Sequence, residues 1–329
     1  MTDPAPAPLR ADLARAAATA KALRDEIGKV LVGQDEVVEQ VLVTLFSGGH
    51  ALVEGVPGLG KTLLVRALAR AIGGASARIQ FTPDLMPADV VGHVLYEART
   101  GEMRLRRGPV FTNILLADEI NRAPAKTQAA LLEVMQEHQV TLEGESLPVP
   151  APFMTLATQN PIELEGTYPL PEAQVDRFLL KVQIDYPSET EEFELVRRIT
   201  EGRVGDSLDV SAVSPVTDAA GVLELQAAAA QVFVDARVGE YAVRLARATR
   251  SWPGVAMGAG PRGGLALVRA GRARALLSGR SFVTPDDVKS IAPAALRHRI
   301  HLSPEIELEG QQADALLAGM LAQVEAPRT

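Results

Sequence analysis

The hydrophobic positions along the chain predict helices that alternate with short strands up to about residue 200. Apolar residues recur at helical spacing from Leu9 to Val30, and a second helical pattern begins at Asp35. Short apolar runs predict strands at 50–54, 78–81, 112–117, 153–157 and 178–184. Helical patterns cover 62–72 and 124–138. Because strands that alternate with helices favour a parallel sheet with helices on both faces, we expect an α/β fold.

Two segments interrupt this alternation. Residues 91–110 contain two strand patterns joined by a turn at Thr100-Gly101, and residues 140–149 contain a shorter pair that turns at Gly144. Both are too short, and too exposed in pattern, to be central strands of the same sheet. We expect two β-hairpins inserted on one face of the domain.

After the last strand the pattern becomes almost entirely helical. Ser188 and Glu191 form a capping box that predicts a helix up to about Thr200, and Thr284 begins another helix with a proline and acidic residues in its first turn. The segment 201–215 is polar and contains glycine, which is typical of a linker. We therefore expect a disordered tail at 1–8, a core at 9–200, this linker, and a small helical domain at 216–329.

The chain has 329 residues, a net charge of −8 and no cysteine. This length suggests about two domains, and the lack of cysteine excludes disulfides and thiolate metal sites. The first residues lack the apolar core of a signal peptide, and no apolar run approaches a membrane span in length. We expect a cytoplasmic protein without a membrane segment. The negative charge argues against a dedicated nucleic-acid motor but leaves room for a local basic groove.

Residues 55–62 read GVPGLGKT, a complete G-x-x-x-x-G-K-T phosphate-binding loop between a predicted strand and a predicted helix. Its glycines let backbone N–H groups turn toward an anion, and the helix N-terminus adds about half a positive charge. Lys61 can reach the terminal phosphates, and the Thr62 hydroxyl can hold Mg²⁺. The residues expected to bind a nucleoside triphosphate here are Gly55, Val56, Pro57, Gly58, Leu59, Gly60, Lys61, Thr62 and Leu63.

Two further strand ends carry polar residues suited to hydrolysis. The apolar run NILLA ends in Asp118 and Glu119. Asp118 can hold Mg²⁺, and Glu119 can orient the attacking water or accept its proton. Asn160 follows a third strand and can position that water, although an Asn-Pro step at a strand end is also typical of a simple turn. The chain lacks the N-K-x-D string that a GTPase would need, so ATP is the expected nucleotide.

In these motifs the chain resembles the MoxR family of AAA+ ATPases. The matching strings, in chain order, are GVPGLGKT at 55–62, LLADEINRAPAKTQAALLEVMQE at 115–137, TQNP at 158–161 and YPLPEAQVDRF at 168–178. The resemblance extends from about Val30 to beyond Pro261. It implies an AAA+ ATPase core with inserted β-hairpins and an all-helical lid, as in the related magnesium-chelatase subunit. It also implies a hexameric ring that remodels client proteins, with von Willebrand factor A domain proteins as usual partners.

The resemblance also implies roles for single residues at the nucleotide. Asp118 would be the Mg²⁺ aspartate and Glu119 the catalytic glutamate. Asn160 would be the sensor that positions water. Gly33, in the string VGQDE, would lie near the adenine.

Three arginines receive roles at boundaries between subunits or domains. Arg177 resembles the arginine finger that reaches the nucleotide of a neighbouring subunit, and Arg122 would also face that boundary. Arg262 resembles the second sensor in the lid, with ATP and Mg²⁺ bound between core and lid. The lid string reads GAGPRGG, where the family leads us to expect a serine before the proline and an alanine after the arginine. Each glycine in this first helical turn costs about 1 kcal/mol relative to alanine, which leaves open how firmly Arg262 is held.

The other candidate residues carry weaker signals. Arg104, Arg106 and Arg107 form a tight basic cluster in the first hairpin, which indicates either a solvated face or a contact surface, in a ring's pore or for an acidic client. His298 and His301 lie three residues apart and could share a helix face. Since no third ligand is evident, we expect them to be solvated or to cap a helix.

Two other functional classes stay open. A nucleic-acid motor or loader would share the loop and the carboxylates, and salt-sensitive stimulation of ATP hydrolysis by DNA would favour it. A nucleotide-gated scaffold without turnover is disfavoured by the intact Asp118-Glu119 pair. The primary prediction is an ATP hydrolase that forms a ring and assembles or activates partner proteins.

Overall fold

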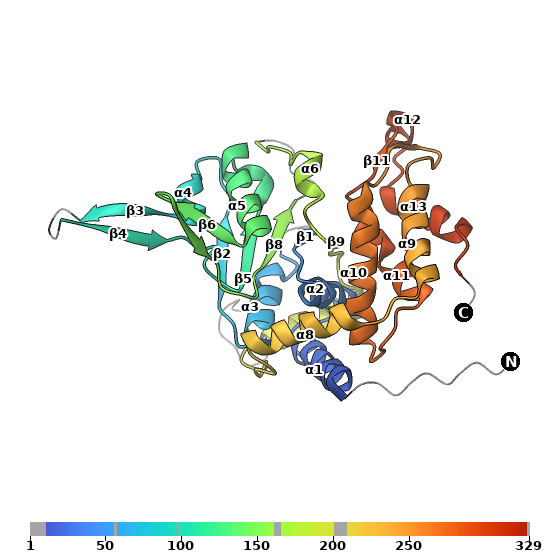
Figure 1. Cartoon of the computed structure of the whole chain (residues 1–329), viewed down its shortest axis with the longest axis horizontal. Helices are drawn as coiled ribbons and strands as arrows, with labels where there is room; N and C mark the ends of the chain where they lie inside the picture. The colour runs from blue at the N-terminus through green and yellow to red at the C-terminus, as the bar shows by residue number, and fades with distance from the viewer. Residues whose placement is uncertain are drawn as a thin grey trace.

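The computed structural model describes residues 11–55, 58–97, 99, 101–160, 166–200 and 209–327. An α/β core is followed by a largely helical C-terminal part, as predicted (Figure 1). The helices of the core are α1 (Ala11–Gly28), α2 (Asp35–Phe46), α3 (Lys61–Ala71), α4 (Pro87–Val91), α5 (Ala125–Glu137), α6 (Glu172–Val175) and α7 (Glu189–Thr200). The predicted tail at 1–8 and most of the predicted linker lie outside the described residues.

Five parallel strands form the central sheet in the order β2-β5-β8-β1-β9. Their bounds are β1 (Ala51–Glu54), β2 (Ser76–Gln80), β5 (Ile114–Asp118), β8 (Met154–Gln159) and β9 (Leu180–Gln183). Because all five run in one direction, their carboxyl ends lie along one edge of the sheet and their amino ends along the other. The phosphate-binding loop, Asp118 and Asn160 therefore follow neighbouring strands at the carboxyl edge.

Alternate residues of the strands face two hydrophobic layers. Ile114 and Leu116 of β5 belong to a cluster with α1, α2 and α3, whereas Leu115 and Ala117 belong to a second cluster with α5. Buried residues of the C-terminal helices continue the first cluster. A fully buried leucine or isoleucine contributes about 1.5–3 kcal/mol relative to its exposed state, so this shared core fixes the C-terminal helices against the sheet.

Both predicted hairpins are present. β6 (Gln139–Leu142) pairs with β7 (Glu145–Pro148), and β3 (Gly92–Glu97) pairs with β4 (Glu102–Arg107) in an arm that projects from the core (Figure 1). Neighbouring residues of a strand point to opposite faces, so Arg104 and Arg106 share one face of the arm and Arg107 lies on the other. The guanidinium of Arg107 lies 5.2 Å from the centre of the Phe111 ring. The basic cluster is exposed, as one interpretation expected, but it is divided between two faces.

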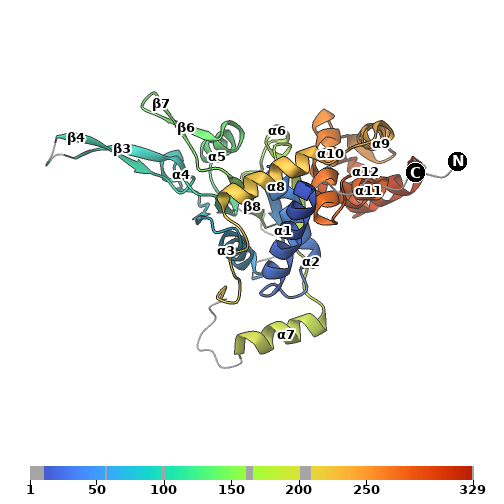
Figure 2. The same ribbon diagram turned by 60° about the horizontal axis from the view of Figure 1, so that its bottom comes forward.

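Helix α7 stands apart from the helices that cover the sheet (Figure 2). The predicted capping box begins it: the Ser188 backbone N–H and hydroxyl donate to Glu191 Oε2 at 2.8 and 2.6 Å. The same Glu191 side chain covers Gly33. Gly33 has a φ of +70°, which favours glycine, and a Cβ there would lie 2.5 Å from the Glu191 carboxyl carbon, so the Glu191 side chain would have to move.

The C-terminal part contains six helices and one small sheet among its described residues. Its elements are α8 (Ala219–Gln231), α9 (Ala236–Ala248), β10 (Val255–Met257), α10 (Pro261–Leu277), α11 (Pro285–Leu296), β11 (His301–Leu302), α12 (Pro304–Leu308) and α13 (Ala313–Gln323). The antiparallel pair of β10 and β11 differs from the all-helical expectation. Thr284 and Asp287 form the capping box of α11 where the sequence predicts it.

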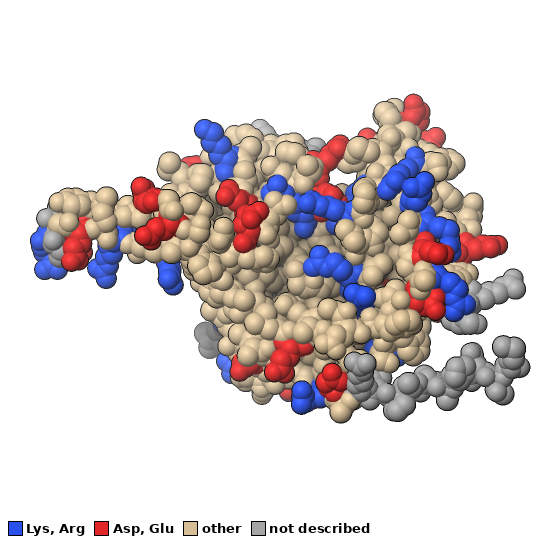
Figure 3. Space-filling view, in the orientation of Figure 1, with Lys and Arg blue, Asp and Glu red and all other residues tan. Residues whose placement is uncertain are grey.

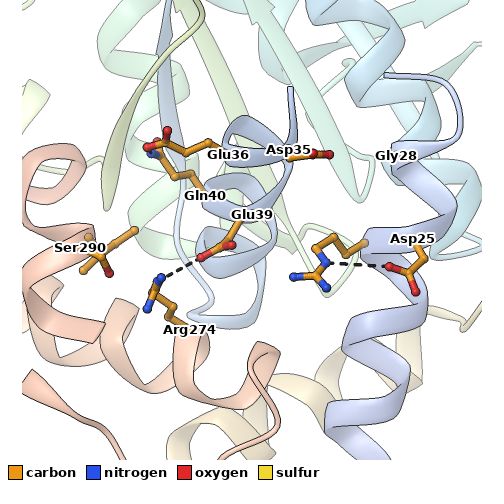
Figure 4. A pocket seen from close by; sticks show the side chains of 10 residues that line it. Asp25, Gly28, Asp35, Glu36, Glu39, Gln40, Arg274 and Ser290 are labelled. Carbon is orange, nitrogen blue, oxygen red and sulfur yellow. Dashed lines mark hydrogen bonds and ion pairs between the residues drawn. The ribbon is translucent and has the colours of Figure 1, made fainter. Parts of the chain in front are cut away.

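Charged side chains join the core to the C-terminal helices. Arg274 of α10 donates to Glu39 of α2 at 3.0 Å and to Asp287 of α11 at 2.9 Å. Burial by itself raises the pKa of Asp287, but hydrogen bonds from Arg280 and Thr284 hold the pKa below its usual value. The Glu39–Arg274 contact crosses a groove of about 800 Å³ between α1, α2 and α10 (Figure 4). These ion pairs add a second constraint on the orientation of the C-terminal helices.

The described end of the predicted linker is irregular but closely attached to the core. Val213 is fully buried, the Ser214 N–H donates to Glu26 at 2.9 Å, and the Val216 N–H donates to the Ala71 carbonyl at 2.8 Å. These contacts fix the point at which the chain leaves the core for α8.

The expectation that His298 is solvated is wrong. Helix α11 ends at Leu296, so His298 and His301 share no helix face. His298 is 9% exposed, and its Nε2 donates to the Phe178 carbonyl at 3.1 Å, which gives the buried ring a partner. His301 lies on β11 and is exposed, as expected, with Nε2 3.4 Å from Glu172.

A second buried histidine, His50, precedes β1. Its Nδ1 accepts a hydrogen bond from the Thr155 N–H at 3.0 Å, so its Nε2 must carry the proton that it donates to the Met135 carbonyl at 3.0 Å. The ring is therefore neutral. Burial lowers the pKa of His50 to about 4 from its ordinary 6.5.

This histidine makes the folded state sensitive to acid. Between pH 6.5 and 4 the unfolded chain binds a proton at residue 50 that the folded chain does not, so stability falls as the pH falls. We expect His50 to account for a loss of about 2 kcal/mol in the free energy of unfolding between pH 7 and pH 5. Urea denaturation at both pH values measures this loss, and His50→Gln should reduce it. An equal loss in wild type and variant would contradict the assignment.

Candidate functional site

The carboxyl ends of four neighbouring strands enclose a pocket of about 290 Å³, here called the strand-end pocket. It is lined by Gly58, Gly60, Lys61, Thr62, Leu63, Arg78, Gln80, Asp118, Glu119 and Asn160. The structure thus brings together the loop, the two carboxylates and the amide that the sequence predicts for one site. Of the predicted loop residues, Val56 and Pro57 lie outside the described residues.

The loop has the backbone geometry of an anion site. Gly58 and Gly60 have φ values of +89° and +77°, which turn successive N–H groups to one side. Gly55 has no room for a side chain, because a Cβ would lie 2.7 Å from the Ile184 carbonyl oxygen. Helix α3 begins at Lys61, so its positive end faces the pocket. Leu59 is also held, since its carbonyl accepts from Gln34 at 3.0 Å.

Lys61 is the cation of the loop. Its Nζ donates to the Gly55 carbonyl at 2.7 Å. Burial lowers the pKa of the Lys61 ammonium, while the nearby carboxylates of Asp118 and Glu119 act in the opposite direction. The Gly55 carbonyl is a neutral acceptor. A phosphate in the pocket would give this half-buried ammonium a directly bonded anionic partner.

Asp118 and Glu119 are held in defined positions by residues of β2. Arg78 Nη2 donates to Asp118 Oδ2 at 2.6 Å, and Gln80 Nε2 donates to Glu119 Oε2 at 2.8 Å. Arg122 also donates to Glu119 Oε2, at 3.0 Å. Arg122 thus contacts the candidate catalytic residue within one chain, and its expected place at a subunit boundary stays a prediction.

Thr158 of β8 connects the carboxylate of Asp118 to the backbone of Glu119. Its hydroxyl donates to Asp118 Oδ1 at 2.6 Å and accepts from the Glu119 N–H at 2.9 Å. Glu119 has a φ of +55°, a conformation that costs a residue with a side chain about 1–3 kcal/mol. The hydrogen bond from its N–H helps to maintain this conformation, which aims the carboxylate into the pocket.

Sequence reasoning missed Arg78, Gln80 and Thr158. Arg78 and Gln80 lie two residues apart at the end of β2, so they point to the same side, but only the pairing of β2 with β5 shows that this side faces Asp118. The donor set of the pocket fits Mg²⁺ and a phosphate chain: a hydroxyl at Thr62, carboxylates at Asp118 and Glu119, and the N–H groups of the loop.

Gly33 does not line the strand-end pocket. Its neighbour Gln34 contacts the loop at Leu59, so the segment that carries Gly33 lies against the loop. The expected position of Gly33 near the adenine stays a prediction.

Arg177 and Arg262 lie in a different place, a cleft of about 330 Å³ here called the basic cleft. The charged residues that line it are Asp176, Arg177, Arg262, Arg269 and Arg299. Arg262 of α10 approaches Asp176, with 3.7 Å between Nη1 and Oδ2, and its side chain is 51% exposed. Figure 3 shows basic side chains gathered between α6 and α10 on this face.

The basic cleft and the strand-end pocket lie at opposite edges of the sheet. Residues 176–179 precede β9 and residues 48–50 precede β1, so the cleft is at the amino edge, whereas the phosphate-binding loop follows β1 at the carboxyl edge. A strand of four residues spans about 13 Å. Arg177 is therefore at least a strand's length from the loop of its own chain.

Arg262 does not line the strand-end pocket of its own chain, and its expected role as the second sensor stays a prediction. Every described residue that lines the strand-end pocket belongs to the core. The reason is the packing of α10 on α2 and of α11 on β9, which holds the C-terminal helices beside the edge strand. The glycine after Arg262 has a packing role: a Cβ on Gly263 would lie 3.0 Å from Ala259 and 3.1 Å from Leu296.

The fold and the pocket define a P-loop nucleoside triphosphatase with a helical lid, and comparisons with known proteins agree. Residues 50–180 match the family described as "ATPase family associated with various cellular activities (AAA)", and residues 247–319 match the AAA lid domain. A crystal structure of a protein from Cytophaga hutchinsonii assigned as an ATPase is 39% identical, with a TM-score of 0.88 over 96% of this chain and 97% of that chain.

Two curated relatives are similar over most of their length. Chaperone MoxR1 of Mycobacterium tuberculosis is 47% identical over 84% of this chain and 74% of that protein. YeaC of Bacillus subtilis is 45% identical over 92% of this chain and 93% of that protein. The chain belongs to the MoxR family of AAA+ ATPases. Among the described residues no helix is both long and apolar enough to cross a membrane.

The hydrogen bonds of Thr158 predict a measurable effect. Thr158→Val keeps the shape of a fully buried side chain but leaves the Glu119 N–H and one Asp118 oxygen without their partner, which should lower the free energy of unfolding by about 1–3 kcal/mol. Chemical denaturation measures the change.

Thr155 of the same strand is the matched control. It is also fully buried, but its hydroxyl has no hydrogen-bond partner in the part of the chain that the structure describes. Thr155→Val should therefore be neutral or stabilising. Equal losses at the two positions would refute the bridging role of Thr158.

Proposed function

We propose that this protein is a Mg²⁺-dependent ATP hydrolase that works in the cytoplasm as a homo-oligomeric ring, expected to be a hexamer. The observation that carries the proposal is the separation of two sites in one chain. The carboxylates and the phosphate-binding loop lie at the carboxyl edge of the sheet, and Arg177 and Arg262 lie at the amino edge. Each chain thus offers half of a hydrolytic site to each of two neighbours.

At the strand-end pocket, ATP would bind with its phosphates against the N–H groups of the loop and with Lys61 at the terminal phosphates. Thr62 and Asp118 would hold Mg²⁺, which neutralises phosphate charge when it is bound. Glu119 would accept a proton from a water molecule whose oxygen attacks the γ-phosphorus, while Asn160 orients that water. The bond between the γ-phosphorus and the bridging oxygen breaks, and ADP and phosphate are released.

The basic cleft would complete the site of a neighbouring chain. Arg177 and Arg262 line the basic cleft and not the strand-end pocket of their own chain. Placed against the terminal phosphates of a neighbour's ATP, they would stabilise the charge of the transition state. An arginine supplied in this way contributes about 10³–10⁵ in rate in related nucleotide hydrolases. Hydrolysis would therefore depend on assembly.

We further propose that hydrolysis drives the remodelling of partner proteins. The family membership supports this class of activity, and one relative is itself named a chaperone. The projecting arm of β3 and β4 would contact the client, with Arg104 and Arg106 on one of its faces. Proteins with von Willebrand factor A domains are the partners that the family resemblance implies.

Removal of the catalytic base tests the proposed chemistry. Glu119→Gln keeps the size and position of the side chain but cannot accept the proton of the attacking water, so we expect ATP binding at wild-type affinity and a turnover lower by about 10²–10⁴-fold. Fluorescence titration with a labelled ATP analogue and a phosphate-release assay measure the two quantities.

Glu137→Gln is the control. Glu137 is exposed at the end of α5, so this substitution removes the same charge at a position away from the pocket. It should bind and hydrolyse ATP as the wild type does. Turnover by Glu119→Gln at the wild-type rate would show that another group activates the water.

A further inference from the structure

Arg299 is a buried arginine that the proposed chemistry does not use. It follows α11 and is 7% exposed. A buried guanidinium is costly unless its donors are all paired, and here each of its nitrogens has an acceptor. The acceptors on the core side lie in the short segment 176–179 that carries Arg177.

Arg299 contacts the residues on both sides of Arg177 along the chain. Its Nε donates to Asp176 Oδ1 at 2.8 Å, and its Nη2 donates to the Asp176 carbonyl at 3.3 Å. Beyond Arg177, Nη2 donates to the Phe178 carbonyl at 2.6 Å and Nη1 to the Leu179 carbonyl at 3.1 Å. The planar fork of one side chain thus fixes the backbone immediately before and after Arg177.

The same side chain joins this segment to the lid. Nη1 of Arg299 also donates to the Ala295 carbonyl in α11. On the other side, Oδ2 of Asp176 lies 3.7 Å from Nη1 of Arg262 in α10. Asp176 therefore stands between Arg299 and Arg262, and the positions of Arg177 and Arg262 depend on one shared carboxylate and one buried guanidinium.

We propose that Arg299 is a positioning residue that locks the segment carrying Arg177 to the lid, so that Arg177 and Arg262 meet a neighbouring chain's nucleotide as one rigid unit. The proposal rests on the proposed function, in which those two arginines act on another chain. It adds that any rotation of the lid moves both arginines together. A misplacement of about 1 Å can cost a reaction about 100-fold in rate, so a poorly positioned Arg177 should lower the rate of ATP hydrolysis.

The first test is Arg299→Lys, which keeps the charge but cannot pair with Asp176, Phe178 and Leu179 at once. We expect unchanged affinity for a labelled ATP analogue, because the strand-end pocket is intact, and a kcat lower by about 10- to 100-fold. Wild-type kcat in this variant would overturn the proposal.

Mixing of subunits separates positioning from a general loss of structure. Arg299→Lys chains have an intact strand-end pocket and a displaced finger, whereas Glu119→Gln chains have an inactive pocket and an intact finger. An equimolar mixture should hydrolyse ATP several-fold faster than the sum of the two proteins alone, because Glu119→Gln chains supply Arg177 to their neighbours. Arg299→Lys mixed with Arg177→Ala should show no such gain.

A mixture of Arg177→Ala with Glu119→Gln distinguishes failure of the positioning role of Arg299 from failure of the proposed function. If that mixture regains activity and the mixture with Arg299→Lys does not, the positioning role is wrong and the proposed function stands. If neither mixture regains activity, the arginines do not act on a neighbour, and both proposals fail.

Arg297→Lys is the matched structural control. Arg297 directly follows α11, its side chain is 9% exposed, and it reaches the core at the Lys181 carbonyl at 3.3 Å, away from Arg177. We expect it to lower the melting temperature without a change in kcat.

Should Arg299→Lys fail to fold, Asp176→Asn tests the same role of Arg299, since it removes the shared carboxylate and keeps the backbone acceptors. Retained wild-type kcat in Asp176→Asn, or a kcat loss in Arg297→Lys equal to that of Arg299→Lys, would contradict the proposal.

Discussion

The parallel pairing of β1 with both β8 and β9 is the constraint on which the rest of the structure depends. Because β1 is short and runs parallel to its neighbours, His50 lies at the amino edge of the sheet and the phosphate-binding loop lies at the carboxyl edge. Pairing with β8 brings Asn160 to the loop, and pairing with β9 brings Arg177 to the opposite edge. With this register, Arg177 and the phosphate-binding loop of one chain lie at opposite edges of the sheet, which is the basis of the proposal that the site is completed in an assembly.

Polar contacts then fix the positions of the charged side chains at each edge. At the carboxyl edge Arg78 and Arg122 hold the two carboxylates, so a bound metal and nucleotide must compete with existing ion pairs of 2.6 and 3.0 Å. At the amino edge basic groups predominate, because Asp176 is the single carboxylate among the described charged residues that line the basic cleft. The arginines of the basic cleft would be complementary in charge to the phosphates of a nucleotide at the strand-end pocket of another copy, which favours contact between copies of the same chain.

Local signals made much of this predictable from the sequence. The loop, the Asp118-Glu119 pair, both hairpins and the capping boxes at Ser188 and Thr284 are each encoded within a few residues. The strand order is not, and with it the partners Arg78, Gln80 and Thr158 escaped prediction, because they meet Asp118 and Glu119 only across paired strands. The place of Arg262 in the basic cleft escaped prediction for the same reason: the packing of α10 and α11 on α2 and β9 decides its position, and no short string encodes that packing.

The dependence of ATP hydrolysis on assembly is the central claim, and a dilution series tests it most directly. Mg²⁺-dependent phosphate release per chain would be measured from dilute to concentrated wild-type protein, with the molecular mass determined at each concentration. The account predicts that the rate per chain rises as monomers assemble and becomes constant once the oligomer is complete. A constant rate per chain in protein that is monomeric by mass at every concentration would contradict it.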